Sequence, residues 1–187
     1  MKIKLSTLLL LFILCGTGGC SSDDDNANGS DPVNQLPEAT QIGANTAGAL
    51  VDGEPITPKG GGVTPNLIAF YQFLDGEYLF SIGFADNEQE NVKSINIFTS
   101  RVILQQNTTF NLDNPDDSSL TGGGGEYSIN GDEIEYNTIE DNIGELTITH
   151  LDEQNRIVSG TFWFDAVNEK GEVVEVREGR FDVTYSQ

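Results

Sequence analysis

The chain has 187 residues and a formal net charge of −21, from 9 Lys and Arg against 30 Asp and Glu. A field of that sign repels phosphate backbones and anionic lipid head groups, so it argues against nucleic acid as a partner and against membrane attachment through a basic patch. Both cysteines, Cys15 and Cys20, lie near the N-terminus. The chain after them has no thiol for a disulfide framework, a thiolate metal site or a cysteine nucleophile.

Residues 1–19 have the order of a secretory signal peptide. Lys2 and Lys4 form a positive region, residues 8–14 are an unbroken apolar run, and small residues follow up to Cys20. The run is shorter than the about 20 apolar residues that a transmembrane helix needs. A small-residue stretch that ends in cysteine resembles a lipobox, which implies cleavage before Cys20 and a lipid on Cys20.

Residues 20–41 are polar and acidic with no apolar periodicity, so we expect a flexible tether that lifts a folded domain from the membrane. From residue 42 to residue 187, short apolar runs alternate with turn residues, which predicts a single β domain. The dipeptides Asp52-Gly53, Asp75-Gly76 and Asn130-Gly131 predict tight hairpins.

Several strands can be placed from period-two alternation. We expect strands at residues 67–74, 78–85, 92–99, 102–104, 107–112, 146–150 and 157–167. The strand at 67–74 is apolar on both faces, which predicts a central position covered on both sides. Residues 113–125 end in four glycines and are predicted to form a flexible connection.

The last strand changes its inward phase. Val174 and Val176 occupy even positions, whereas Phe181 and Val183 occupy odd positions. A β-bulge at Gly179 would absorb the extra residue, since glycine accepts the positive φ that some bulges require.

No segment shows an apolar helical stripe of useful length. The predicted fold is therefore all-β, an antiparallel meander of about nine or ten strands that forms a barrel or a sandwich.

Three segments resemble known proteins. Residues 20–25 (CSSDDD) resemble the lipid site and acidic export signal of Bacteroidota surface lipoproteins. Residues 36–46 with 50–53, and residues 159–164 with 178–183, resemble the opening and the ending of an uncharacterised lipoprotein domain family from the same bacteria. The resemblance implies a cell-surface location on the outer membrane, with Asp23, Asp24 and Asp25 as the export signal after Cys20. It implies no catalytic residue.

Candidate catalytic and metal-binding residues are few. His150 is the single histidine and is expected on the face of Leu146 and Ile148; with no Cys or second His, we interpret it as structural. Acidic pairs such as Glu133 and Glu135 are interpreted as a solvated strand face, although a hydrolase would also use two carboxylates. Calcium binding at residues 113–117 through Asp113, Asp116 and Asp117 stays open. We expect no cofactor.

Trp163 is the strongest indication of a binding site. By parity it lies opposite Phe162 and Phe164, so it should be partly exposed, or else packed under the loop at 113–125. The sequence favours a non-enzymatic module that binds an extracellular polymer or protein. The alternatives are a calycin-like barrel for a small apolar ligand, lined by Phe80, Phe84 and Phe162, and an acid-rich hydrolase.

Overall fold

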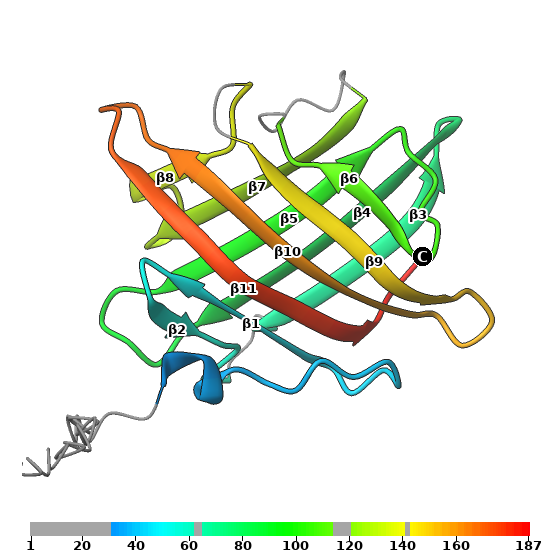
Figure 1. Cartoon of the computed structure of the whole chain (residues 1–187), viewed down its shortest axis with the longest axis horizontal. Coiled ribbons are helices and arrows are strands. Elements are labelled where there is room, and N and C mark those ends of the chain that lie inside the picture. The colour runs from blue at the N-terminus through cyan, green and yellow to red at the C-terminus, as the bar shows by residue number, and fades with distance from the viewer. Residues whose placement is uncertain (1–30, 62–64, 114–120, 141–142) are drawn as a thin grey trace, which may run out of the picture.

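The computed structural model describes residues 31–61, 65–113, 121–140 and 143–187. Within these ranges the chain is almost entirely β, and eleven antiparallel strands form one sheet that curls into a half-barrel (Figure 1). The predicted all-β antiparallel fold is confirmed.

The strands follow one another mainly through short turns. The strands are β1 (Thr46–Val51), β2 (Glu54–Ile56), β3 (Leu67–Leu74), β4 (Glu77–Asp86), β5 (Lys93–Ser100), β6 (Thr108–Asn111), β7 (Gly122–Ile129), β8 (Ile134–Asn137), β9 (Gly144–Asp152), β10 (Ile157–Val167) and β11 (Val173–Thr184). A 3-10 helix, η1 (Pro32–Gln35), precedes the first strand, and a second, η2 (Gly131–Glu133), lies between β7 and β8.

The order of strands in the sheet is β2-β1-β11-β10-β8-β7-β5-β4-β3, and β9 pairs with β10 and with β6. The chain beyond β11 returns to the opposite end of this order. There Ser186 exchanges backbone hydrogen bonds with β3: its N–H donates to Ala69 O (3.0 Å), and its carbonyl accepts from Tyr71 N–H (3.0 Å). The end of the chain thereby links β3 to β11.

The three predicted hairpins are confirmed. They join β1 to β2, β3 to β4, and β7 to β8. Asp52, Asp75 and Asn130 have positive φ, and so does the glycine after each of them. The first two loops consist of just these two residues, and two consecutive positive φ values match the right-handed twist of the flanking strands. The third loop is longer than predicted, residues 130–133, because Ile129 pairs with Ile134.

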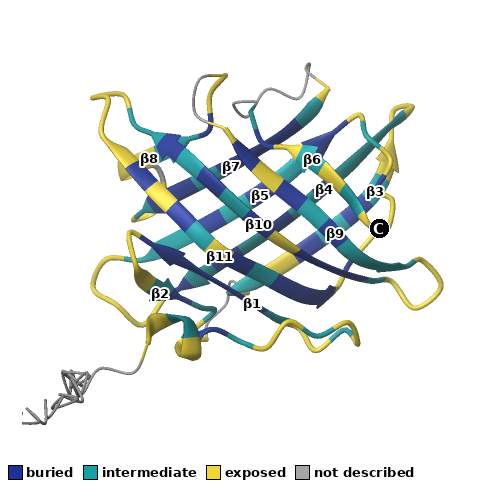
Figure 2. Cartoon of the chain, in the orientation of Figure 1, coloured by how far each residue is buried: buried dark blue, intermediate teal, exposed yellow. Residues whose placement is uncertain are grey.

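Buried positions alternate with more exposed positions along strands such as β4 and β10 (Figure 2). The inward positions form one apolar core, as the period-two patterns predict. Its bulky members include Phe80, Ile82, Phe84, Ile95, Ile97, Leu146, Ile148, Val158, Phe162, Phe164, Val176, Phe181 and Val183.

Two local predictions about strands are wrong. β3 is the last strand of the sheet order and not a central one, and its Phe73 and Leu74 are exposed. Ile68 on its outward face is also exposed, so the strand is not covered on both faces. Residues 102–104 are not a strand, although Leu104 is buried in the core.

The glycine run before Glu126 is also not a flexible connection. Gly122 to Gly125 begin β7 and pair with β5. A Cβ atom on Gly125 would lie 2.6 Å from Cδ1 of Phe164, so the absence of a side chain there makes room for the Phe164 ring. The run is therefore packed strand, selected by its neighbour and not by chain flexibility.

The predicted bulge in β11 is confirmed. Phe162 pairs with Gly179 and Phe164 pairs with Val176, so β11 carries one residue more than β10 between these pairs. The positive φ, however, belongs to Glu178 (55°) and not to Gly179. Gly179 is needed for a different reason: a Cβ there would lie 2.4 Å from Cε2 of Phe162.

The first described residues, 31–41, lie on the domain, although the sequence assigns them to the tether. Leu36 is buried, and residues 40–44 are attached to the sheet by Asp182 of β11. The fully buried Asp182 carboxylate accepts five hydrogen bonds, from Thr40 Oγ1 (2.6 Å), Ile42 N–H (3.0 Å), Gly43 N–H (2.8 Å), Ala44 N–H (3.1 Å) and Ser159 Oγ (2.8 Å).

Candidate functional site

Part of what the sequence predicts lies outside the described residues. This applies to the signal peptide at 1–19, to Cys20, and to the export residues Asp23, Asp24 and Asp25. It also applies to Asp116 and Asp117, so of the candidate calcium ligands only Asp113 is described. Among the described residues, no group of three or more His, Cys, Asp or Glu is arranged to hold a metal ion.

Trp163 lines a groove on the sheet. It belongs to β10, and its half-buried ring stands on the side of the strand opposite to Phe162 and Phe164, as predicted. Trp163 pairs with Glu145 of β9, and its indole N–H donates to a carboxylate oxygen of Glu145 (3.3 Å). The adjacent strand therefore fixes the orientation of the ring.

Arg177 holds the other side of Trp163. The bulge in β11 places this arginine opposite the tryptophan, and its Cζ lies over the indole at 5.4 Å from the ring centroid. The guanidinium donates to the carbonyls of Phe164 (3.1 Å) and Val176 (3.0 Å) and pairs with Asp165 at 2.5 Å. A cation in this position is attracted to the ring quadrupole, so Trp163 is held from two sides.

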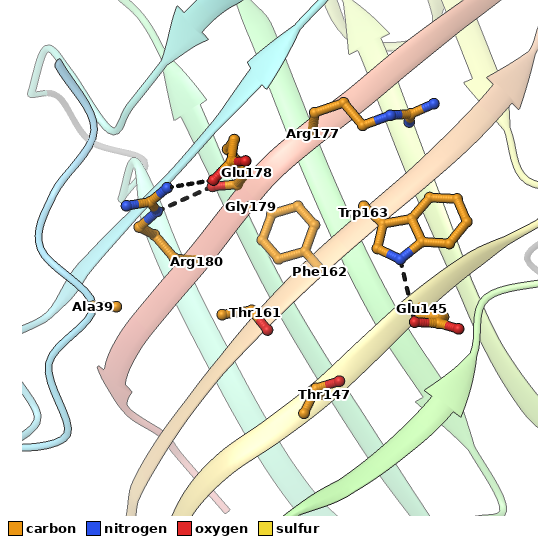
Figure 3. A pocket seen from close by; sticks show the side chains of 10 residues that line it. All are labelled: Ala39, Glu145, Thr147, Thr161, Phe162, Trp163, Arg177, Glu178, Gly179 and Arg180. Atoms are coloured by element: carbon orange, nitrogen blue, oxygen red, sulfur yellow. Dashed lines mark hydrogen bonds and ion pairs between the residues drawn. The ribbon is translucent and has the colours of Figure 1, made fainter. Parts of the chain in front are cut away.

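The groove beside this ring has a volume of about 410 Å³ (Figure 3). Thr147 of β9 and Thr161 of β10 form part of its lining, and Ala39 of the N-terminal segment closes one side. Its remaining residues are Glu145, Phe162, Trp163, Arg177, Glu178, Gly179 and Arg180. We call these ten residues the Trp163 groove.

Arg180 secures the strained turn of the bulge. Its guanidinium donates to the carbonyl of Glu178 and to the Glu178 carboxylate, both at 3.0 Å. Glu178 has a positive φ, which costs a non-glycine residue roughly 1–2 kcal/mol. The arginine offsets part of this cost and leaves the Glu178 carboxylate beside the groove.

The groove has almost no net charge, and the acidic residues next to it make its surroundings negative. Arg177 is already paired with Asp165 and Glu175, and Arg180 with Glu178, while Glu145 adds a further carboxylate. An anionic ligand would therefore meet no free cation here. Hydroxyls, carboxylates and one aromatic ring instead suit a neutral ligand that is rich in hydroxyl groups.

The residues around Trp163 are brought together by pairing between strands, which cannot be deduced from the sequence alone. Glu145, Thr147 and Arg177 lie in two other strands, and Arg177 meets the ring only because of the extra residue in the bulge. The phase switch from Val176 to Phe181 is the signal that could have found Arg177. The partners from β9 leave no such signal.

His150, Ser159 and Asp182 lie in a row across three strands, but in the wrong order for a catalytic triad. Ser159 pairs with His150 on one side and with Asp182 on the other, and its hydroxyl donates to Asp182. Burial raises the pKa of the Asp182 carboxyl, but the hydrogen bonds from Thr40 and from the N–H groups of residues 42–44 outweigh it and lower the pKa to about 2, so the carboxylate is a very weak base. A triad needs histidine between the serine and the carboxylate.

The position of His150 also corrects a prediction. β9 carries one residue more than β10 between the pairs Ser159–His150 and Gly160–Ile148. The inward phase therefore changes, and Leu151 rather than His150 packs against the core beyond Ile148.

The interior residues suggested for a small apolar ligand contact one another. The rings of Phe84 and Phe162 are 6.4 Å apart between centroids, and Phe80 and Phe162 both lie near Phe181, at 6.2 and 6.4 Å. Side chains thus fill this part of the half-barrel, which weighs against a ligand cavity there.

Fold and groove together define an antiparallel β half-barrel with an open groove on its sheet. DUF6252, a domain of unknown function, matches residues 85–183, from the end of β4 into β11. This stretch is more than half of the chain, so the chain belongs to the DUF6252 family, and it contains every residue of the Trp163 groove except Ala39. No curated protein and no solved structure matches the chain. Within the described ranges, no helix is long and apolar enough to span a bilayer.

Proposed function

We propose that this chain is a lipid-anchored surface protein of Bacteroidota whose Trp163 groove binds a neutral glycan outside the cell, without catalysing a reaction. The observation that carries the binding proposal is the half-buried Trp163 ring, which is fixed by Glu145 and Arg177 at the side of an open groove. Sugar rings present an apolar face that packs on aromatic rings and hydroxyls that bond to polar side chains.

The lining supports a neutral sugar over other ligands. Thr147 and Thr161 offer hydroxyls, and the Glu145 and Glu178 carboxylates accept hydrogen bonds from sugar hydroxyls. Because the arginines are already paired with carboxylates, a uronate would gain little from them and would face a net negative protein.

Replacing Trp163 with alanine should abolish most of the glycan affinity. The full chain, kept in detergent micelles, would be screened on a glycan array, and the Kd for each hit would be measured by calorimetry. Removal of a central aromatic anchor should raise that Kd by about tenfold or more. Phe73→Ala is the matched control, since Phe73 is an exposed aromatic residue outside the groove. A glycan that responds to Phe73→Ala and not to Trp163→Ala would contradict the proposed site.

The membrane anchor is proposed from the N-terminal sequence, where the small-residue stretch before Cys20 and the acidic residues after it support it. Cys20→Ser in the full chain should abolish incorporation of radiolabelled palmitate in a bacterial host. Cys15→Ser should leave the labelling unchanged, because Cys15 would leave with the signal peptide. Labelling that survives Cys20→Ser would refute the anchor and leave the groove proposal standing.

A further inference from the structure

A second cavity lies where β3, β4, the turn after β9 and the last residues of the chain meet. It has a volume of about 440 Å³ and shares no residue with the Trp163 groove. Its walls carry four aromatic rings, those of Tyr71, Phe73, Tyr78 and Tyr185. Gln72, Ile103, Glu153 and Gln187 complete the lining, and we call these eight residues the aromatic cavity.

The four rings form a continuous series of contacts. Centroids are 4.9 Å apart for Phe73 and Tyr78, 5.5 Å for Tyr78 and Tyr71, and 5.8 Å for Tyr71 and Tyr185. The Tyr71 hydroxyl accepts a hydrogen bond from Leu104 N–H (3.1 Å), and the backbone after Tyr185 is held on β3. The walls are therefore preorganised by the fold.

The mouth of the cavity exposes apolar surface. Phe73 is 63% exposed and Ile103 is 56% exposed, and both line the cavity. Single exposed apolar side chains are ordinary, but here they adjoin the ring series at one opening. Phe73 shares a face of β3 with the buried residues Ala69 and Tyr71, so the cavity lies at the end of the inward face of this strand.

The electrostatics of the cavity are negative. Glu153 is exposed at its rim, and within the described part of the chain its carboxylate has no hydrogen bond or ion pair, while no Lys or Arg is among the described lining residues. Burial and the nearby Glu153 charge raise the pKa of both Tyr71 and Tyr185. A hydrogen bond from Leu104 opposes the shift at Tyr71, and the charge of Arg156 opposes it at Tyr185. The phenols thus stay protonated and neutral at physiological pH.

We propose that the aromatic cavity binds an organic cation that carries an alkylated ammonium group. The faces of aromatic rings attract such a cation, most strongly where it is desolvated, and the unpaired Glu153 carboxylate adds Coulomb attraction. The net charge of −21 raises the local concentration of cations and opposes anions such as fatty acids. A neutral ring compound would gain the stacking but nothing from the carboxylate.

The test compares choline with its neutral isostere, 3,3-dimethylbutan-1-ol, by calorimetry on the full chain in nonionic detergent. The two molecules have nearly the same shape and differ in charge. We expect saturable choline binding, and binding of the isostere that is weaker by about tenfold or more. Equal affinities, or no saturable binding of choline, would overturn the proposal.

Two variants locate the site. Glu153→Gln removes the carboxylate charge and Phe73→Leu removes a ring while keeping apolar bulk, and each should weaken choline binding severalfold. Glu145→Gln makes the same change of carboxylate to amide in the Trp163 groove and should leave choline binding unaltered. Choline binding that responds to Glu145→Gln and not to Glu153→Gln would refute the assignment. Because Trp163 plays no part in it, a negative result here leaves the glycan proposal untouched.

Discussion

Replacing Asp182 with alanine should lower the free energy of unfolding by about 3–5 kcal/mol. The carboxylate is fully buried and accepts five hydrogen bonds, three of them from the backbone of residues 42–44. Alanine would leave these donors without their acceptor, and each lost bond to a charged group costs more than a neutral one. Urea unfolding of the full chain measures the loss, and Glu169→Ala, at an exposed turn, should change stability by about 0.5 kcal/mol or less.

The same residue gives a pH signature that distinguishes a charge effect from simple loss of volume. The folded protein lowers the pKa of Asp182 from 3.8 to about 2. A lowered pKa means that its stabilisation is complete above pH 3.8 and is lost as the pH falls towards 2, by about 2 kcal/mol in total. The difference in stability between the parent chain and Asp182→Asn should therefore shrink over this interval. A difference that is constant from pH 5 to pH 2 would contradict the role assigned to the carboxylate.

The parts of the fold that can be predicted are those determined by residues close together in the sequence. Hairpins at Asp52-Gly53 and Asp75-Gly76 follow from residues that tolerate positive φ, and the bulge follows from a phase switch within one strand. In both cases the cause and the effect lie within a few residues of each other. The strand positions between them follow from alternation for the same reason.

The predictions that failed depend on neighbours distant in sequence. The sequence predicts a loop at Gly125, because glycine is unfavourable in a strand unless a neighbouring side chain needs the space. That neighbour, Phe164, is far along the chain. β3 is apolar on both faces, which predicts a central strand, yet Ile68 and Leu74 on its outward face are exposed, because no distant element of the described chain packs over them. The phase switch associates Gly179 with the bulge, but the steric reason for a glycine, the Phe162 ring, lies across the strand pair.

The candidate site shows the same division. The alternation of side chains along β10 predicts that Trp163 lies on its outer side. The contacts of Trp163 with Glu145 and Arg177, however, depend on strand pairing and on the register of the bulge. The aromatic cavity has no sequence signature at all, since its rings come from β3, β4 and the last residues of the chain. A single sequence therefore indicates that an aromatic residue is available for binding, whereas the charges beside it require the fold.

Gly125→Ala should destabilise the protein by about 2–3 kcal/mol, although alanine normally suits a strand at least as well as glycine. The backbone of Gly125 does not need a positive φ, so the cost is steric. A Cβ would lie 2.6 Å from Cδ1, 2.8 Å from Cε1 and 2.8 Å from Cγ of Phe164, a fully buried ring that cannot move into solvent. Urea unfolding measures the change.

A double-mutant cycle with Phe164→Leu separates this account from a general intolerance of the strand. Leucine shortens the side chain that the new methyl group would strike, so the Gly125→Ala and Phe164→Leu pair should cost less than the two single changes together, by about 1–2 kcal/mol. Gly144→Ala is the contrasting case, because its Cβ would meet the backbone of β10, at Trp163 O and Phe164 Cα, in addition to Phe164 Cβ. Leucine at position 164 cannot relieve a backbone clash. Rescue of Gly144→Ala, or strict additivity for Gly125→Ala, would show that side-chain crowding at Phe164 does not explain the glycine at position 125.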